Sequence, residues 1–280
     1  MNKRLKKYFL IFVGPLLLCF IVAFVIPFIM GVYLSFCQFN TVENASFTGL
    51  ENYKKLLTDK GFLDSLWFTV KFTAVSVVSV NVTAFFLALA LTRGLRGSNF
   101  FRTVFFMPNL IGGIVLGYIW NLIINGILGF FGVDITYSAS YGFWGLVAVM
   151  NWQLIGYMMV IYIAGLQSIP SSVMEASQID GASPFQTLRK ITVPMIMPSV
   201  TICTFLTLSN SFKLFDQNLA LTNGAPANET TMMALDIYNT FYNTFGQQGL
   251  GQAKAVVFAL LVAAIAFFQL KITRGREGEL

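Results

Sequence analysis

Apolar residues fill six long stretches of the chain, and polar segments separate them. The stretches cover approximately residues 9–36, 66–91, 104–124, 142–166, 191–215 and 253–270. A helix needs about 20 consecutive apolar residues to cross a bilayer. The pattern therefore predicts an all-α membrane protein, a six-helix transmembrane bundle that forms a single domain over residues 1–280.

The polar segments predict shorter elements between these spans. Residues 38–65 contain FTGLENYKKLL, which predicts a short surface helix, and residues 125–141 form a glycine-rich turn region. The long segment 216–252 contains a predicted amphipathic helix near 231–242. The first apolar stretch follows a basic segment, as in a signal peptide. It is too long for a signal-peptide core, so we expect a retained helix that is kinked at Pro15 and Pro27.

Composition excludes several classes of protein. Charged residues make up 11% of the chain, against about 25% in soluble domains, so a soluble globule is excluded. The chain has no histidine, and Cys19, Cys37 and Cys203 show no metal-binding spacing. We expect no metal site and no catalytic residues. The phosphate-binding pattern G-x-x-x-x-G-K-[ST] is also absent, so this chain cannot itself cradle nucleotide phosphates in that way.

Positive charge is unequally shared between the two sets of loops. With the N-terminus inside, the inner loops and termini hold these basic residues: Lys3, Arg4, Lys6, Lys7, Arg93, Arg96, Arg102, Arg189, Lys190, Lys271, Arg274 and Arg276. The outer loops hold Lys54, Lys55 and Lys60. The positive-inside rule then predicts that both termini are cytoplasmic. It places the loop 167–190 inside and the segment 216–252 outside, and it explains the net charge of +6 without nucleic acid.

The loop 167–190 predicts a helix, a turn and a second helix. Asp180-Gly181 is a turn signal because glycine adopts positive φ without steric cost. Ser183 followed by Pro184 is a common helix start. The small residues Ala176 and Ala182 keep this surface low enough for another protein to approach closely.

The sequence EASQIDGASPFQTLRKITVP in this loop resembles the motif E-A-A-x-x-x-G, with a following I-x-x-P, of bacterial ABC importer permeases. The segments GLENYKKLL, FFRTVFFMPNLIGG and FKLFDQNLALTNGAP are similar to the maltose-permease-like branch that carries carbohydrates. The resemblance covers essentially the whole chain. It departs from the family pattern at Ser177, where the motif has alanine, and at Ala225, where the usual residue is glycine.

The resemblance implies a type I ABC importer permease in a bacterial cell membrane. Such a chain is a non-catalytic subunit that passes a di- or oligosaccharide from an external sugar-binding protein to the cytoplasm. Its implied partners are a second homologous permease subunit and two copies of a cytoplasmic ABC ATPase. ATP and Mg²⁺ would be bound by the ATPase, so no cofactor is expected in this chain.

Three sets of site residues follow from this resemblance. The expected ATPase-coupling residues are Glu175, Ala176, Ser177, Asp180, Gly181, Ala182 and Pro184. The expected substrate path is Trp152, Gln153, Tyr157, Thr207, Asn210, Ser211 and Leu214. The expected contacts to the binding protein are Thr222, Asn223, Gly224 and Pro226.

A simpler structural explanation stands beside each set. The loop could merely connect two spans, the polar path residues could hold helices together by hydrogen bonds, and the external residues could form an ordinary turn. Lys213 and Asp216, three residues apart, either neutralise each other or form a gate. We expect mutual neutralisation.

Three rival functions remain to be weighed. An importer of glycerol phosphate or another small polar solute has the same architecture, but an anionic substrate would need a positive pocket, and only Lys71 and Lys213 come near the spans. An ion-coupled secondary transporter would need buried acidic residues, and no carboxylate lies clearly in mid-span. A membrane-embedded enzyme would need a nucleophile and a base, and no such pair can be assembled.

Overall fold

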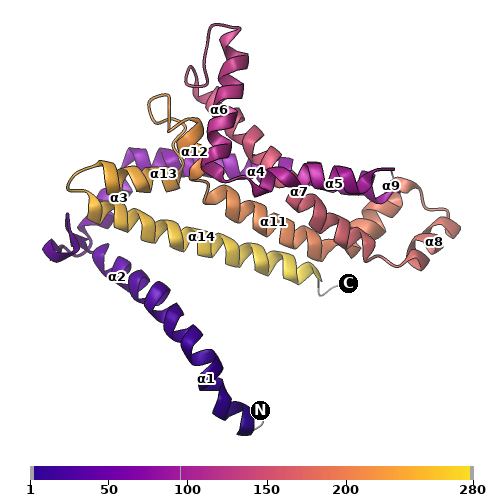
Figure 1. The fold of residues 1–280 in the computed structure, drawn as a ribbon, viewed down its shortest axis with the longest axis horizontal. Helices are drawn as coiled ribbons and strands as arrows, with labels where there is room; N and C mark the ends of the chain where they lie inside the picture. Colours follow the sequence, from indigo (N-terminus) through magenta and orange to yellow (C-terminus); the bar gives the residue numbers. More distant parts are fainter. Residues whose placement is uncertain (1–2, 95, 278–280) are drawn as a thin grey trace. The chain divides into compact units, whose positions relative to one another are not determined.

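The computed structural model describes residues 3–94 and 96–277, and these residues are predominantly helical (Figure 1). Two short strands, β1 (Cys37–Gln38) and β2 (Ser46–Phe47), pair antiparallel. The chain divides into two compact units. The first contains the chain up to Phe62 and Ile237–Leu260, and the second contains Leu63–Asp236 and the chain from Leu261 onward.

The helices follow one another along the chain in this order: α1 (Lys3–Phe20), α2 (Ile26–Leu34), α3 (Glu51–Thr58), α4 (Lys60–Thr92), α5 (Ser98–Phe106), α6 (Gly113–Gly129), α7 (Ala139–Gln167), α8 (Ser171–Ile179), α9 (Pro184–Thr187), α10 (Val193–Met195), α11 (Met197–Phe212), α12 (Asp216–Leu221), α13 (Met233–Tyr238) and α14 (Gln248–Glu277). Short 3₁₀ turns occupy Val42–Asn44 and Met107–Leu110, and π-helical turns occupy Ile21–Val25, Leu188–Thr192 and Asn239–Asn243.

The first unit packs α3 and the start of α14 against the strand pair. Asn52 on α3 donates hydrogen bonds to the carbonyl oxygens of Ser35 and Cys37, at 3.0 and 2.9 Å. Gly249 on α14 lies against the Cys37 carbonyl, where any side chain would collide with the backbone. The Asn52 amide therefore gives hydrogen-bond partners to the backbone carbonyls at the start of β1, as buried backbone groups require.

The second unit is built around α7. Its inward residues, such as Leu146, Met150 and Met158, are fully buried among apolar side chains of α4 and α11. Hydrogen bonds also join the helices: the Tyr162 hydroxyl donates to Asn81 at 2.8 Å, and Asn81 donates to Thr207 at 3.2 Å. Apolar packing and a few internal hydrogen bonds are the interactions that hold membrane helices together.

In the described part of the chain, four helices are long and apolar enough to cross a membrane, or up to six if each of two bent helix pairs is one span. The four regions are Phe12–Leu34, Lys60–Thr92, Ala139–Gln167 and Gln248–Gln269. The predicted surface helix in 38–65 is α3, and the predicted helix near 231–242 is α13 with its π-helical turn. The orientation of the termini stays a prediction.

The predicted span over 104–124 contains a break. The helix breaks after Leu110, and the axes of Ser98–Leu110 and Gly113–Gly129 differ by 103° (Figure 1). Ile111 and Gly112 are extended, with ψ of 131° and 140°. Pro108 has already tightened the preceding turn into a 3₁₀ form, and proline cannot donate the hydrogen bond that a continuous helix requires.

The predicted span over 191–215 also contains a break. The segments Pro184–Met195 and Met197–Phe212 meet at 71°. Pro198 has no N–H to bond the carbonyl of residue 194, which is itself a proline. Ile196 between them leaves the helical region, with φ of −94° and ψ of 11°. The fifth apolar stretch is therefore divided: the π-helical turn and α10 precede the break at Ile196, and α11 follows it.

Candidate functional site

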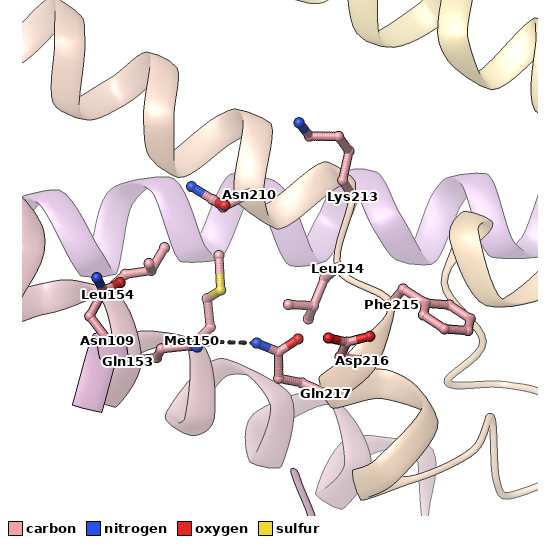
Figure 2. Close-up of a pocket in the computed structure, with 10 residues that line it drawn as sticks. All are labelled: Asn109, Met150, Gln153, Leu154, Asn210, Lys213, Leu214, Phe215, Asp216 and Gln217. Carbon is pink, nitrogen blue, oxygen red and sulfur yellow. Dashed lines mark hydrogen bonds between the residues drawn. The ribbon is translucent and has the colours of Figure 1, made fainter. Parts of the chain in front are cut away.

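A polar pocket of about 270 Å³ opens where α7 passes the first helix break and the junction of α11 with α12 (Figure 2). Its lining residues are Asn109, Met150, Gln153, Leu154, Asn210, Lys213, Leu214, Phe215, Asp216 and Gln217. All of them belong to the second unit. Interrupted helices place polar side chains and backbone groups inside an otherwise apolar bundle, which is how transporters build binding sites.

Gln153 joins the walls of this pocket. Its Oε1 accepts a hydrogen bond from Gln217 at 2.6 Å (Figure 2), and its Nε2 donates to the Ile111 carbonyl at 3.3 Å. The Ile111 carbonyl is available because the helix breaks at that residue. One amide on α7 therefore satisfies a backbone group of one broken helix and a side chain of α12.

Two glycines let α6 and α12 approach each other closely. A Cβ at Gly117 would lie 2.6 Å from the Ala220 Cβ, and one at Gly113 would lie 2.7 Å from the Asp216 Cβ. Asn121 on α6 also donates to the Leu221 carbonyl at 2.7 Å. The two helices therefore form one packed wall beside the pocket.

The expected neutralisation between Lys213 and Asp216 is wrong for this structure. Both residues line the pocket, but no ion pair joins them. In Figure 2 the Lys213 side chain extends away from the Asp216 carboxylate. The chain turns between α11 and α12, so the two residues do not share a helix face despite their spacing of three.

The pocket brings together three of the seven expected path residues: Gln153, Asn210 and Leu214. Asn210 is exposed on α11, and its side-chain amide also donates to the Leu206 carbonyl at 2.8 Å. Leu214 is buried and supplies an apolar part of the wall. These three remain candidates for contact with a substrate.

The other expected path residues lie outside the pocket. Thr207 is fully buried and accepts a hydrogen bond from Asn81, so the structure supports helix–helix bonding there. Ser211 is also fully buried on α11. Tyr157 packs on Phe106, with ring centroids 6.3 Å apart, and Trp152 packs on Trp120 at 5.7 Å.

Sequence reasoning missed five residues that complete the lining: Asn109, Met150, Leu154, Phe215 and Gln217. Asn109 follows Pro108 in the 3₁₀ turn, so a proline followed by Gly112-Gly113 was the available signal of a helix break. Gln217 lies in α12, beyond the predicted end of the fifth span. Only the turn between α11 and α12 places its side chain beside Gln153.

The loop between α7 and α11 has the predicted helix–turn–helix form. Gly181 has φ of +72°, which confirms the predicted glycine turn. Ser183 caps α9: its hydroxyl accepts from the Gln186 N–H at 3.3 Å, and the Gln186 side chain accepts from the Ser183 N–H at 2.8 Å. This capping box fixes the start of the second helix.

Most of the expected coupling residues are exposed on this loop. Those open to solvent are Glu175, Ala176, Asp180, Gly181 and Pro184, whereas Ala182 is half-buried. Ser177 is buried, and its hydroxyl donates to the Met174 carbonyl at 2.8 Å, so this hydroxyl already has a partner within α8. Two apolar side chains of this loop that the sequence analysis did not single out are also strongly exposed: Ile179 is 86% exposed and Phe185 is 69% exposed.

The expected binding-protein contacts are only partly at the surface. Thr222 and Gly224 are buried, and Thr222 lies in a hydrogen-bond network with Asn218 and Thr230. These two residues therefore shape the loop and offer no contact surface. Asn223 is exposed and Pro226 is half-buried, and their contact with a binding protein stays a prediction.

Comparison with known proteins identifies the family. Residues 80–276 match the family described as the inner membrane component of binding-protein-dependent transport systems. The chain belongs to this family. It is an inner-membrane permease subunit without catalytic function, and it belongs to a transport system that depends on a binding protein.

Curated relatives match over nearly their full length. The chain is 45% identical to a probable starch degradation products transport system permease protein, AmyD, of Thermoanaerobacterium thermosulfurigenes, over 98% of this chain and 96% of the relative. It is 31% identical to the multiple sugar-binding transport system permease protein MsmF of Streptococcus mutans, over 99% of each chain.

The fold is similar to that of a solved importer. A bacterial alginate ABC transporter, crystallised with its alginate pentasaccharide-bound periplasmic protein, contains a chain with a TM-score of 0.82. The match covers 98% of this chain and 97% of that chain at 17% identity. At this identity the similarity concerns the fold, which confirms the expected importer permease architecture.

Proposed function

We propose that this chain passes a neutral di- or oligosaccharide through the Gln153 pocket, from an external binding protein toward the cytoplasm. The observation that carries the proposal is the polar pocket at the helix breaks of a permease. The names of relatives that carry starch products and multiple sugars support the substrate class.

The chemistry of the pocket suits sugar hydroxyls. Four side-chain amides, those of Asn109, Gln153, Asn210 and Gln217, can each donate and accept hydrogen bonds. Met150, Leu154 and Phe215 supply apolar surface for the C–H faces of a ring. Polar side chains are expensive inside a bilayer unless they line a cavity, so their concentration here favours a transport path.

We further propose that the loop between α7 and α11 couples transport to ATP hydrolysis in partner ATPases. Glu175 and Asp180 offer exposed carboxylates to basic residues of the ATPase. Ile179 and Phe185 offer apolar anchors of the kind that dominate the energy of protein interfaces. ATP and Mg²⁺ would bind in the ATPase chains.

A second homologous permease is the remaining proposed partner. The apolar region Phe12–Leu34 has no buried residue in the single chain. On α6, apolar residues at 114, 118, 122 and 127 are also exposed. Lipid and a second permease are the two partners that can cover such surfaces in a membrane.

An importer of an anionic solute such as glycerol phosphate is the alternative. Lys213 favours it, because this residue lines the pocket. Asp216 opposes it, because the same pocket then contains both signs of charge and lacks the positive excess that an anion requires.

Copurification and uptake test the proposal together. The tagged chain, isolated from membranes, is expected to bring a second permease and an ATPase with it. Asn210→Ala should lower oligosaccharide uptake about tenfold, equivalent to one lost hydrogen bond of about 1.4 kcal/mol. Asn99→Ala is the matched control, because Asn99 is exposed at the start of α5 and lies outside the pocket.

Two results would contradict the proposal, one for the type of transporter and one for the pocket. A chain that is isolated alone and transports in response to an ion gradient overturns the ABC assignment. Uptake that is unchanged in Asn210→Ala, with the ATPase still bound, removes the pocket from the transport path.

A further inference from the structure

The wall of the Gln153 pocket contains one carboxylate, that of Asp216, at the first residue of α12. Apart from Lys213, the other lining side chains are neutral. Within the described residues, the Asp216 carboxylate forms no ion pair and no side-chain hydrogen bond. A charged group without a partner in a pocket wall is available to a ligand.

Asp216 lies against the beginning of another helix. A Cβ added at Gly113 would come within 3.0 Å of an Asp216 carboxylate oxygen, so the carboxylate touches the first residue of α6. The N–H groups in the first turn of a helix have no partner within the helix, and the helix dipole there is positive. Gly112, at the N-cap, has no side chain that could satisfy them. The Asp216 carboxylate therefore lies at the beginning of α6, where no basic residue is needed to place it.

Lys213 does not cancel this charge. Its side chain is exposed and extends away from Asp216 (Figure 2). An exposed lysine ammonium is strongly hydrated and screened by salt, and it holds no fixed geometry. The carboxylate is half-buried and held against α6, so it is the fixed charge of the pocket.

We propose that Asp216 determines the charge selectivity of the pocket. The carboxylate accepts hydrogen bonds from the hydroxyls of a neutral oligosaccharide, and it repels an oligosaccharide that carries a carboxylate or phosphate. This inference rests on the proposed function, because it assumes that sugar occupies the pocket. Specificity by repulsion needs only one charge in a partly dehydrated site, since like charges placed together are unfavourable there.

The test compares two trisaccharides that differ at one group. One is maltotriose, and the other has its terminal hydroxymethyl group oxidised to a carboxylate. Binding of each labelled sugar is measured by equilibrium dialysis on the assembled, detergent-solubilised importer without external binding protein, so the selectivity of that protein does not enter. The wild-type importer should bind maltotriose at least tenfold more tightly than the acidic sugar.

Three variants of the same assembly sharpen the comparison. Asp216→Asn should reduce the preference for maltotriose about tenfold, because it keeps the shape of the side chain and removes its charge. Asp216→Glu keeps the charge and should restore most of the preference. Asp134→Asn is the control, because Asp134 is exposed in the loop between α6 and α7, where its removal should change nothing.

Each outcome gives a decision. If Asp216→Asn binds the two sugars with the wild-type preference, or if it loses the binding of both equally, Asp216 does not select charge. In that case, binding of maltotriose by the wild-type importer would still support the pocket as a sugar site. If the wild-type importer binds maltotriose no better than the acidic sugar, the inference is overturned. If it binds neither sugar, the pocket is not a sugar site, and the proposed function fails with the inference.

Discussion

At the scale of single residues, a buried ion pair joins two distant parts of the chain. Lys254 on α14 is 3% exposed, and its Nζ lies 2.8 Å from Asp59, just before α4. The Lys254 ammonium also donates to the Thr240 hydroxyl at 2.9 Å, and the Asp59 carboxylate accepts from the Phe62 N–H at 3.3 Å. Asp59 therefore caps α4 and holds the beginning of α14 at the same time.

This pair predicts acid sensitivity of the first unit. Partial burial raises the pKa of Asp59, but the hydrogen bond and charge of Lys254 and the N–H groups of Phe62 and Gly61 outweigh it, so the pKa is lowered overall. A lowered pKa stabilises the fold above the unfolded-state value of about 3.9, and this contribution is lost as the pH falls through the folded-state value. Thermal unfolding in detergent should show a step of destabilisation below about pH 4.

Asp59→Asn is expected to remove that step and to lower the free energy of unfolding at pH 7 by about 2 kcal/mol. Asp64→Asn, at an exposed position five residues later on α4, should keep both the step and the stability. An unchanged acid step in Asp59→Asn would assign it to another carboxylate.

At the scale of helices, close approach through glycine sets the packing of the second unit. Gly156 on α7 faces the backbone of Phe105 on α5, and a Cβ there would overlap the Phe105 carbonyl. Gly126 on α6 has no neighbouring atom within 4 Å of an added Cβ. Both glycines lie within apolar helices. Only at Gly156 does the neighbouring backbone leave no room for a side chain. Small residues that allow backbones to meet are typical of membrane helix contacts.

Gly156→Ala should therefore destabilise the assembled bundle by about 2 kcal/mol or more, because overpacking against backbone forces the helices apart. Gly126→Ala should be neutral or stabilising by about 0.5–1 kcal/mol, since alanine is the better helix former. Resistance of the purified protein to thermal aggregation gives the comparison. Equal effects of the two substitutions would mean that α5 shifts freely beside α7.

At the scale of the whole molecule, α7 connects the polar pocket to the exposed loop. Gln153 lies in the pocket, and α7 continues without a break to Gln167, about 20 Å further at 1.5 Å per residue. The loop then begins with α8. One continuous helix therefore links the pocket to the loop, so the proposed coupling can act through a rigid element.

Glu175→Lys should abolish uptake while the chain remains inserted and sugar binding to the pocket persists. The substitution reverses the charge of an exposed residue on α8 and touches no residue of the pocket. Uptake by vesicles containing the full importer, measured beside sugar binding, separates the two effects. Glu229→Lys makes the same change at an exposed site in the other loop and serves as control. If the Glu175→Lys importer takes up sugar at the wild-type rate, the loop has no role in coupling and merely connects two helices.

Much of this protein can be read from its sequence because the bilayer imposes simple rules. Apolar length predicted the spanning helices, since backbone groups must be satisfied within each segment in lipid. Gly181 and Ser183 predicted the turn and the helix start of the loop, because both signals act over a few neighbouring residues. The family motif in the same loop predicted the class of transporter that the comparisons confirm.

The pocket was decided only by tertiary structure. Pro108 and Pro198 interrupt two apolar stretches, but hydropathy averages over such breaks and shows one span in each place. Asn109, Gln153 and Gln217 are distant in sequence and meet because one helix breaks and α11 turns into α12. Helical spacing placed Thr207 and Asn210 together, yet packing buries Thr207 and leaves Asn210 at the pocket. Which polar residue faces another helix and which faces a cavity depends on neighbours that the linear pattern does not specify.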